Sequence, residues 1–365
     1  MAIKVDYNEA TNQLIRSMVR VQESPVDECV ISGTVNTVFE GSGCITYQYI
    51  LITALVAKVT EPSIDVLTLQ VDDPSPGAYA PRPLCKDVVF PFQKSYLENV
   101  IDGANDDPFV NKPARYPRLD KDNKARGDGR RALDSLCDDL PKVNNRETAR
   151  QCLDYVMTRL VRMAEARRKA RADVIESVTA SSSTELRSVL SDLLDQGFGG
   201  NALVLAASAL YRIQYPAEQG YEVIPHPVNQ PGSSKRQLSD LDLKLDGKPF
   251  IGTELKDKPF DEDDVRHAAK TAADGGLKSL IFVSGRSGSL IGQTRTYFEQ
   301  VRDEYAAKGV FVGRVDIDAL MDMVLASQPD IDVPAVLTGI YDQVMDNAGT
   351  PETQMWVYYR LVEFK

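Results

Sequence analysis

Histidine is scarce in this chain, since His226 and His267 are the only two among its 365 residues. Neither lies at ligand spacing from a cysteine or from the other histidine, so a zinc site is not indicated. A serine hydrolase needs a histidine held between a serine and an acid, and two isolated histidines do not point to such an arrangement. Zinc chemistry and serine-nucleophile chemistry are therefore not expected.

Cysteine pairs and long apolar runs are also missing. The five cysteines are widely spaced and form no CxxC pair, which is typical of reduced structural thiols. The longest apolar run, Tyr49–Val59, is too short to span a bilayer and contains Lys58. No basic start followed by an apolar signal core opens the chain. We therefore expect a cytoplasmic protein that does not enter membranes.

The net charge of −11 argues against a general nucleic-acid binder, because such binding depends on neutralising phosphates. A site-specific enzyme can nevertheless confine basic charge to one cleft. Eight basic residues lie between Lys112 and Arg131, in a stretch that reads as an irregular loop. Six more lie between Arg159 and Arg171, on a helix whose charges are most simply explained as solvated.

The length predicts two domains, with a boundary in the serine-containing stretch 177–184. Residues 1–178 read as mainly helical, and residues 60–130 hold many prolines and aspartates, so loops are expected there. Residues 8–21 predict an amphipathic helix with Leu14, Ile15, Met18 and Val19 on one face. Residues 46–59 are apolar enough to be core, and residues 147–178 predict one long or broken helix.

Residues 179–365 read as an α/β domain. Thr184 is a plausible N-cap for a helix that ends at Gly197, and a second apolar helix runs from about 201 to 213. A short strand at 221–224 precedes a hairpin. Helices and strands then alternate: helix 261–273, strand 280–283, helix 291–306, strand 310–315 and helix 316–326. This order is what an α/β nuclease core needs.

The hairpin at 239–258 carries the most information. Asp246-Gly247 predicts its turn. Because side chains alternate along a strand, Asp240 and Asp242 share one face of the first strand, and Glu254 and Lys256 lie together on the second. Two carboxylates and an ammonium can thus converge at one end of a sheet.

These residue types suit a metal-dependent phosphodiesterase. Mg²⁺ prefers oxygen ligands and is commonly held by one or two carboxylates together with waters and phosphate oxygens. We assign Asp240 and Glu254 as metal ligands, with the Leu255 carbonyl as a further one, and Lys256 as the residue that acts on the water. Asp242 is a reserve carboxylate. An exposed, charge-alternating hairpin remains the alternative reading.

Glu185, on the helix before the core, is a second reserve carboxylate for the metal site. Its alternative role is a first-turn carboxylate favoured by the helix dipole. The acids at 261–264 fit the same helix N-terminal role.

Three stretches of the chain resemble the SacI family of type II restriction endonucleases, within the PD-(D/E)xK superfamily. They are Arg82–Cys85 followed by Val88–Pro91, then Asn111–Tyr116, and the hairpin with Leu245–Pro249. Ser239-Asp240 stands where the superfamily motif has Pro-Asp, and Glu254-Leu255-Lys256 forms its second half. The resemblance spans most of the chain, from about residue 45 to the last helices.

This resemblance implies a restriction-endonuclease-like core, a mixed central sheet flanked by helices, behind a helical domain. It also implies metal-dependent cleavage of double-stranded DNA at a short palindromic sequence. Relatives in this family carry a basic residue other than lysine two positions after the glutamate, and lysine four positions after it. Here both positions are lysine, so Lys258 is the reserve for Lys256.

Loops are the candidate DNA-reading elements, because arginine and asparagine side chains can bond guanine and adenine edges. Lysine contacts to phosphate only position the protein. The residues that we expect to contact DNA, against the alternative of ordinary surface loops, are Asn111, Lys112, Arg115, Tyr116, Arg118, Ser234, Lys235 and Arg236.

The preferred hypothesis is a Mg²⁺-dependent type II restriction endonuclease that acts as a homodimer, since two-fold symmetry matches the two strands of a palindrome. Two alternatives remain. One is a structure-selective or repair nuclease on the same core, and the other is a catalytically silent DNA-binding module.

Overall fold

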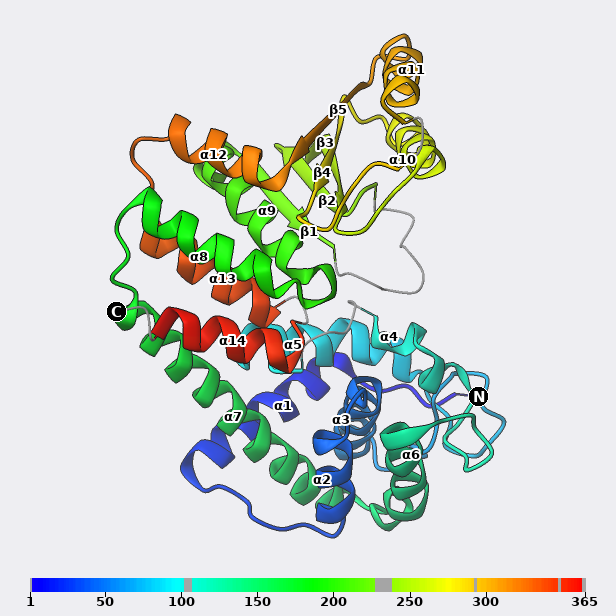
Figure 1. Ribbon diagram of the computed structural model, residues 1–365. Helices are drawn as coiled ribbons and strands as arrows, with labels where there is room; N and C mark the ends of the chain where they lie inside the picture. The colour runs from blue at the N-terminus through cyan, green and yellow to red at the C-terminus, as the bar shows by residue number, and fades with distance from the viewer. Residues whose placement is uncertain (1, 102–106, 227–237, 292–293, 347–348, 363–365) are drawn as a thin grey trace. The chain divides into compact units, whose positions relative to one another are not determined.

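The computed structural model describes residues 2–101, 107–226, 238–291, 294–346 and 349–362. The chain forms two compact units, which span residues 1–170 and 171–365 (Figure 1). The division falls within one long helix, α7 (Arg146–Ser177). No helix in the described part of the chain is long and apolar enough to cross a membrane.

The core of the first unit is built around α3 (Ile45–Thr60), in which every residue from Tyr49 to Val59 is buried. A helix that is apolar on all sides is stable only when other elements surround it. The helices α1 (Tyr7–Glu23), α2 (Ser32–Glu40) and α6 (Gly127–Asp139) pack against α3. The prediction that residues 46–59 belong to the core is confirmed.

Helix α1 is amphipathic as predicted, but its buried face is rotated. Leu14, Ser17 and Val21 are buried, whereas Val19 is 46% exposed. Ser17 faces inward because its hydroxyl donates a hydrogen bond of 2.6 Å to Asp154 of α7. Hydrophobic periodicity reports only apolar side chains and therefore could not predict this hydrogen bond. The bond determines which side of α1 is buried.

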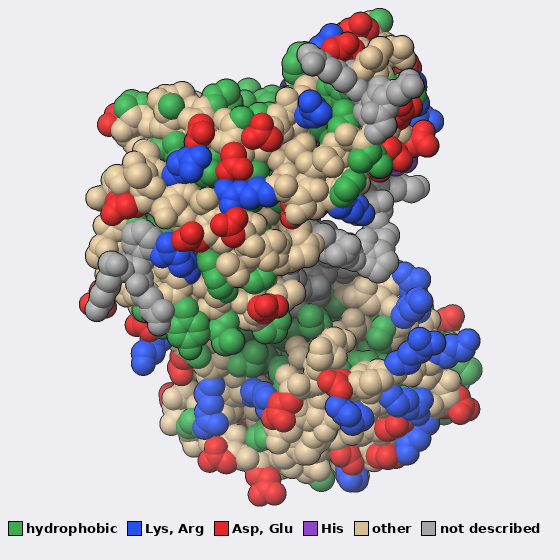
Figure 2. All heavy atoms as spheres, in the orientation of Figure 1, with side chains coloured by type: hydrophobic (Ala, Val, Ile, Leu, Met, Phe, Trp, Pro, Cys, Tyr) green, Lys and Arg blue, Asp and Glu red, His purple; other side chains and the backbone are tan. Residues whose placement is uncertain are grey.

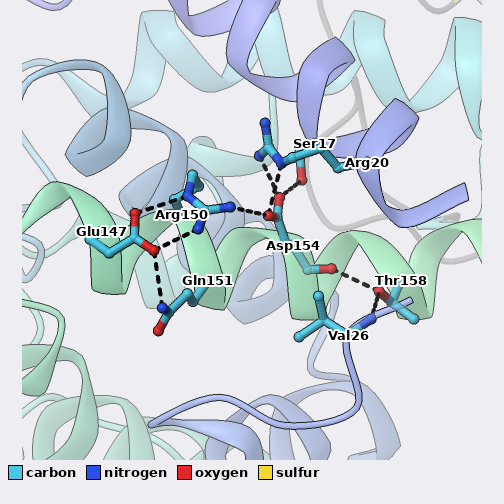
Figure 3. A network of polar contacts seen from close by, with 8 residues as sticks. All are labelled: Ser17, Arg20, Val26, Glu147, Arg150, Gln151, Asp154 and Thr158. Carbon is cyan, nitrogen blue, oxygen red and sulfur yellow. Dashed lines mark hydrogen bonds and ion pairs between the residues drawn. The ribbon is translucent and has the colours of Figure 1, made fainter. Parts of the chain in front are cut away.

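Asp154 is the centre of a polar network that joins α1 to α7 (Figure 3). Its side chain is 4% exposed and accepts hydrogen bonds from Ser17, Arg20 and Arg150. A buried carboxylate is tolerated only when it is paired and hydrogen-bonded. Two guanidinium groups and a hydroxyl meet that requirement here.

Loops and turns dominate the described residues between 60 and 130, as predicted, but residues 81–96 form a continuous helical stretch. It consists of α4 (Pro81–Leu84), a π-helical turn η1 (Cys85–Val89) and α5 (Phe90–Tyr96). Pro81 is the first residue of α4, where a missing N–H costs no intrahelical bond. Pro91 lies within the continuous stretch, just after the π-helical turn, so these prolines do not mark loops.

A mixed five-stranded sheet forms the centre of the second unit, as the sequence predicts. Its order is β1 (Tyr221–Pro225), β2 (Leu241–Leu245), β3 (Lys248–Lys256), β4 (Ser279–Ser284) and β5 (Phe311–Asp316). The first three strands are antiparallel, and β3, β4 and β5 are parallel.

Helices cover both faces of this sheet (Figure 1). On one side lie α10 (Glu262–Asp274) and α11 (Thr294–Ala306), which connect the parallel strands. On the other side lie α8 (Ser183–Gln196), α9 (Asn201–Gln214) and α12 (Ile317–Ser327). Helix α13 (Val333–Asp346) packs next to α9, and α14 (Pro351–Val362) packs against α13. The sequence is therefore correctly read as a helical part followed by an α/β core.

The turn between β2 and β3 is Asp246-Gly247, as predicted. Both residues have positive φ, +50° and +74°. A two-residue turn of this kind matches the right-handed twist of the flanking strands, and it is one of the few places where an aspartate adopts such a backbone. The turn thus makes β2 and β3 a continuous hairpin.

Candidate active site

A β-bulge brings the two halves of the candidate site into register. The pairing of β2 with β3 shifts after Leu243, so that Leu241 pairs with Thr253. The next position places Asp240 opposite Glu254. An unbroken ladder from the same turn would place Asp240 opposite Thr253 and turn Glu254 to the other face of the sheet. The bulge is therefore what puts both acids on one side.

The extra residue of the bulge is Phe250, which has no partner in β2. Its ring packs against Tyr215 and Tyr221, with ring centroids 5.9 and 5.8 Å away. Pro249, directly before it, has no N–H to donate to the ladder. Aromatic packing and a missing donor thus favour the irregularity at this point.

Asp240 lies just before β2 and is held from two directions. Its backbone carbonyl accepts a hydrogen bond of 2.9 Å from the His226 N–H, and its carboxylate Oδ2 accepts one of 2.9 Å from the Leu255 N–H. The N–H and C=O of one strand residue project toward the same edge. The Leu255 carbonyl therefore lies on the strand edge that faces Asp240.

Glu254 and Lys256 face each other at the end of β3, with 3.1 Å between Oε2 and Nζ. Burial and the charge of Asp240 raise the pKa of Glu254, although Lys256 and His267 act in the opposite sense. Burial alone would lower the pKa of Lys256, but Glu254 and Asp240 outweigh it and the pKa is raised. Lys256 is thus an ammonium at neutral pH, beside two acids.

The structure separates Lys258 from Lys256. The strand ends at Lys256, and Lys258 is exposed in the following bend. Side chains two positions apart share a face only within a strand, so Lys258, past the end of β3, is not held on the same face as Lys256. Of the two lysines, only Lys256 forms an ion pair with Glu254 within the described part of the chain.

The two reserve acids lie in other environments. The carboxylate of Asp242 is hydrogen-bonded to Ser239 and His226, at 2.7 and 2.9 Å. Glu185 accepts bonds of 3.0 Å from the N–H groups of Ser181 and Ser182, and these bonds lower its pKa. Its helix begins after Ser182 as N-cap, and not after Thr184 as predicted. Glu185 lies in the first turn of α8, the position of its alternative role, and there it completes a capping box with Ser182.

Two exposed residues of α10, Asp264 and His267, were not among the sequence-based candidates for the site. The charge of Asp264 raises the pKa of Lys256, and that of His267 lowers the pKa of Glu254. Asp264 also belongs to the capping box of α10, the role expected for it. Only the packing of α10 beside β4 brings these side chains toward the strand end.

The donor set fits a hard divalent cation better than zinc. Within the described residues, no three side chains of the histidine, cysteine, aspartate and glutamate types gather as a metal cluster. Asp240, Glu254 and the Leu255 carbonyl would supply oxygen ligands, and Mg²⁺ needs only one or two carboxylates because it keeps several waters. The two acids with one ammonium also leave net negative charge for a cation to neutralise.

The residues proposed for DNA reading in the first unit differ in their availability. Lys112 and Arg115 are exposed, in the short 3₁₀ turn η3 (Lys112–Arg115). Asn111 donates to Thr46 (3.2 Å), and the Tyr116 hydroxyl accepts from the Lys124 N–H.

Arg118 is committed to the interior of the unit. It pairs with Asp65 and Asp73 at 3.0 and 3.3 Å, and the Asp73 side chain is fully buried. Arg118 is therefore less free than Arg115 to reach a base. Ser234, Lys235 and Arg236 lie outside the described residues.

Arg115 also lines a groove of about 500 Å³ in the first unit, together with Gln70, Asp72, Arg82, Phe109, Val110 and Pro117. Arg82 donates to Asp107 (2.9 Å), and Gln70 donates to the Ala114 carbonyl (2.5 Å). Sequence reasoning missed Gln70, Asp72 and Arg82 because they are distant from residue 115 along the chain. The groove combines donors with a carboxylate acceptor, which a merely phosphate-binding surface does not need.

Basic side chains gather on one side of the first unit, where Figure 1 places α4 and α6 (Figure 2). Three arginines of α7 are paired with acids instead: Arg159 lies near Glu40, Arg162 near Asp27, and Arg168 near Glu98. Paired charges on an exposed helix fit the solvated reading.

Two domain-family models match the chain. The model of the SacI restriction endonuclease N-terminal domain matches residues 9–164, and the model of the C-terminal domain matches residues 177–286. Together they cover most of the chain. The first match contains the polar groove, and the second contains Asp240, Glu254 and Lys256. None of the curated proteins matches the chain.

Proposed function

The chain belongs to the SacI restriction endonuclease family, as the resemblance of its motifs predicts, and on this premise we propose that it is a type II enzyme that uses Mg²⁺ to cut both strands of DNA at a short palindromic sequence. The proposal rests on one observation above the others. Leu241 pairs with Thr253, which places Asp240 opposite Glu254, and Lys256 lies 3.1 Å from Glu254 at the same strand end. Two acids and a lysine in this arrangement suit metal-dependent phosphodiester hydrolysis.

Asp240, Glu254 and the Leu255 carbonyl would hold the ion. A bound Mg²⁺ supplies charge neutralisation at a phosphate and activation of water. The hydrogen bond from the Leu255 N–H fixes Asp240 Oδ2 and orients the carboxylate before any ligand arrives. Because the Asp240 carboxylate is already oriented, it needs less rearrangement at the moment of reaction.

Lys256 would hold a water or a phosphate oxygen and stabilise the negative charge that develops there. Its raised pKa makes it a donor in the cation-free enzyme, because the proton is retained at neutral pH. Glu254 is the group that holds this ammonium in place. A role as proton acceptor would require that the surrounding negative charge be neutralised first.

The first unit would read the DNA sequence. Lys112 and Arg115 are exposed, and the groove that Arg115 lines offers Gln70, Asp72 and Arg82, whose side chain is 51% exposed although it pairs with Asp107. Arginine suits guanine, glutamine suits adenine, and aspartate accepts from the cytosine amino group. We assign residues 1–178 to recognition and residues 179–365 to catalysis.

A palindromic target carries the same sequence on both strands, and a two-fold dimer presents one active site to each. We therefore propose a homodimer that acts in the cytoplasm. Analytical ultracentrifugation in the presence of DNA and Ca²⁺ tests the stoichiometry, for which two chains per duplex are expected.

Digestion of phage DNA with and without Mg²⁺ tests the proposed activity. We expect discrete fragments only with the metal, and sequencing of their ends reports site, stagger and symmetry together. A smear would indicate a non-specific or structure-selective nuclease, and bound but uncut DNA a silent module. Asp240→Asn should bind DNA without cutting it, whereas Glu222→Gln, an exposed acid on β1 of the same sheet, should cut normally.

A further inference from the structure

Ser239, Asp242 and His226 form a buried cluster beside the candidate active site. The Ser239 hydroxyl lies 2.7 Å from Asp242 Oδ1, and His226 Nε2 lies 2.9 Å from Asp242 Oδ2. The Asp242 side chain is 4% exposed. Its position in the sequence had suggested a reserve metal ligand, but both of its oxygens are already engaged by protein groups.

The cluster has the side chains of a serine hydrolase triad in the wrong order. In a triad the histidine lies between serine and acid so that it can take the hydroxyl proton. Here the acid lies in the middle. The Ser239 hydroxyl is within 2.8 Å of the Leu241 carbonyl and accepts from the Thr253 N–H (2.9 Å). The arrangement is suited to holding a backbone in place.

The cluster surrounds Asp240. Ser239 precedes Asp240 and ties the chain to β3 through Thr253. His226 donates its backbone N–H to the Asp240 carbonyl. Asp242 bonds to both side chains and so links the two attachments.

We propose that Asp242 is a positioning residue that acts through Ser239 and His226 to hold the Asp240 carboxylate at the metal site. This inference rests on the proposed nuclease function. Groups that orient metal ligands commonly affect metal affinity nearly as strongly as the ligands themselves.

Gly252, the partner of Asp242 across the hairpin, supports this assignment. A Cβ at this position would lie 3.1 Å from the Ser239 hydroxyl oxygen and 2.7 Å from Cδ1 of Leu277. A side chain there would displace Ser239 from the strand. The close approach of Ser239 to β3 therefore depends on the glycine.

The test compares Asp242→Ala, Asp242→Asn and Asp240→Asn by calorimetric titration with Mg²⁺ alone and by the Mg²⁺ concentration that gives half-maximal cleavage. We expect Asp242→Ala to weaken Mg²⁺ binding about 10- to 100-fold. Asp242→Asn should stay within about threefold of the unchanged protein, because its amide can donate to Ser239 and accept from His226. Asp240→Asn should lose both binding and cleavage.

Two results would overturn the inference. If Asp242→Asn lost Mg²⁺ binding as completely as Asp240→Asn, Asp242 would be a ligand. If Asp242→Ala kept normal Mg²⁺ binding, the cluster would not act on Asp240. Should Asp242→Ala fail to fold, Ser239→Ala replaces it, with the same expected loss. Retained cleavage by Asp240→Asn would instead contradict the proposed active site itself.

Discussion

Asp154 in the first unit and Glu254 in the second are both acids beside basic side chains, but their surroundings differ. Asp154 is 4% exposed and receives bonds from Arg20, Arg150 and the Ser17 hydroxyl. Glu254 is 15% exposed, forms an ion pair with Lys256, and has a second acid, Asp240, as its neighbour.

The difference separates a structural charge cluster from a binding site. Around Asp154 two arginines outnumber the single acid, so no further cation is needed to balance its charge. Around Glu254 the acids outnumber the ammonium, and the pKa of Glu254 is raised as a result of burial and the charge of Asp240. Such an excess of negative charge in a half-buried site is stabilised when a cation binds.

The largest expected effect comes from Glu254→Gln. Cleavage should fall at least about 10³-fold, because a metal ligand contributes several kcal/mol to transition-state stabilisation. The melting temperature without Mg²⁺ should not fall, since burial and the charge of Asp240, which disfavour the charged form of Glu254, outweigh its pairing with Lys256. Initial cleavage rates and thermal melts measure both quantities. A normal cleavage rate would remove Glu254 from the site.

Asp154→Ala should have the opposite pattern. We expect a loss of about 3 kcal/mol in the free energy of unfolding, at the low end for a broken buried pair because its arginines are partly exposed. Cleavage measured well below the melting temperature should be retained. Glu9→Ala, which removes an exposed pair with Arg16, is the control and should change stability by less than about 1 kcal/mol. Equal losses from the two variants would contradict the comparison.

Lys256 and Lys258 allow a second comparison, between a lysine inside the candidate site and one outside it. Lys256→Ala should lower the cleavage rate about 10²- to 10³-fold, as expected for a donor that stabilises developing charge. Lys258→Ala, past the strand end and exposed, should change it by less than about threefold. Single-turnover cleavage distinguishes them. The reverse order would assign the catalytic role to Lys258.

The smallest effect is expected at the recognition groove. Asp72→Asn should bind random DNA more tightly, because a negative charge is lost, and should discriminate about tenfold less between cognate and random duplexes. Asp122→Asn, exposed within the basic stretch, should raise both affinities equally. Gel-shift titrations without Mg²⁺ measure the affinities for the cognate and the random duplex. If the ratio of these affinities is unchanged in Asp72→Asn, Asp72 does not take part in base reading.

Local patterns were sufficient to predict much of the second unit. Asp246-Gly247 indicated the hairpin turn, and the apolar run at 280–283 indicated β4. These signals depend on residues close together in the chain. The rotation of α1 toward Asp154 and the helices at 81–96 were missed, because a distant carboxylate decides the first and prolines conceal the second.

The recognition groove could not be predicted from local patterns. Gln70, Asp72 and Arg82 join Arg115 only after the chain has folded around α3. Arg118 carried the same sequence signal as Arg115, yet Asp65 and Asp73 hold it within the unit. A basic residue in a loop does not by itself indicate whether it is free.

By itself, the sequence determined which acids and lysine the hairpin carries, where its turn lies, and which family the chain resembles. Only the tertiary structure decided that Asp240 and Glu254 share a face, because a single bulged residue reverses the alternation of a strand. That bulge depends on Phe250 packing against Tyr215 and Tyr221, which come from other parts of the fold. The alternation of side chains is a local property, whereas the register between strands is set by what packs around them.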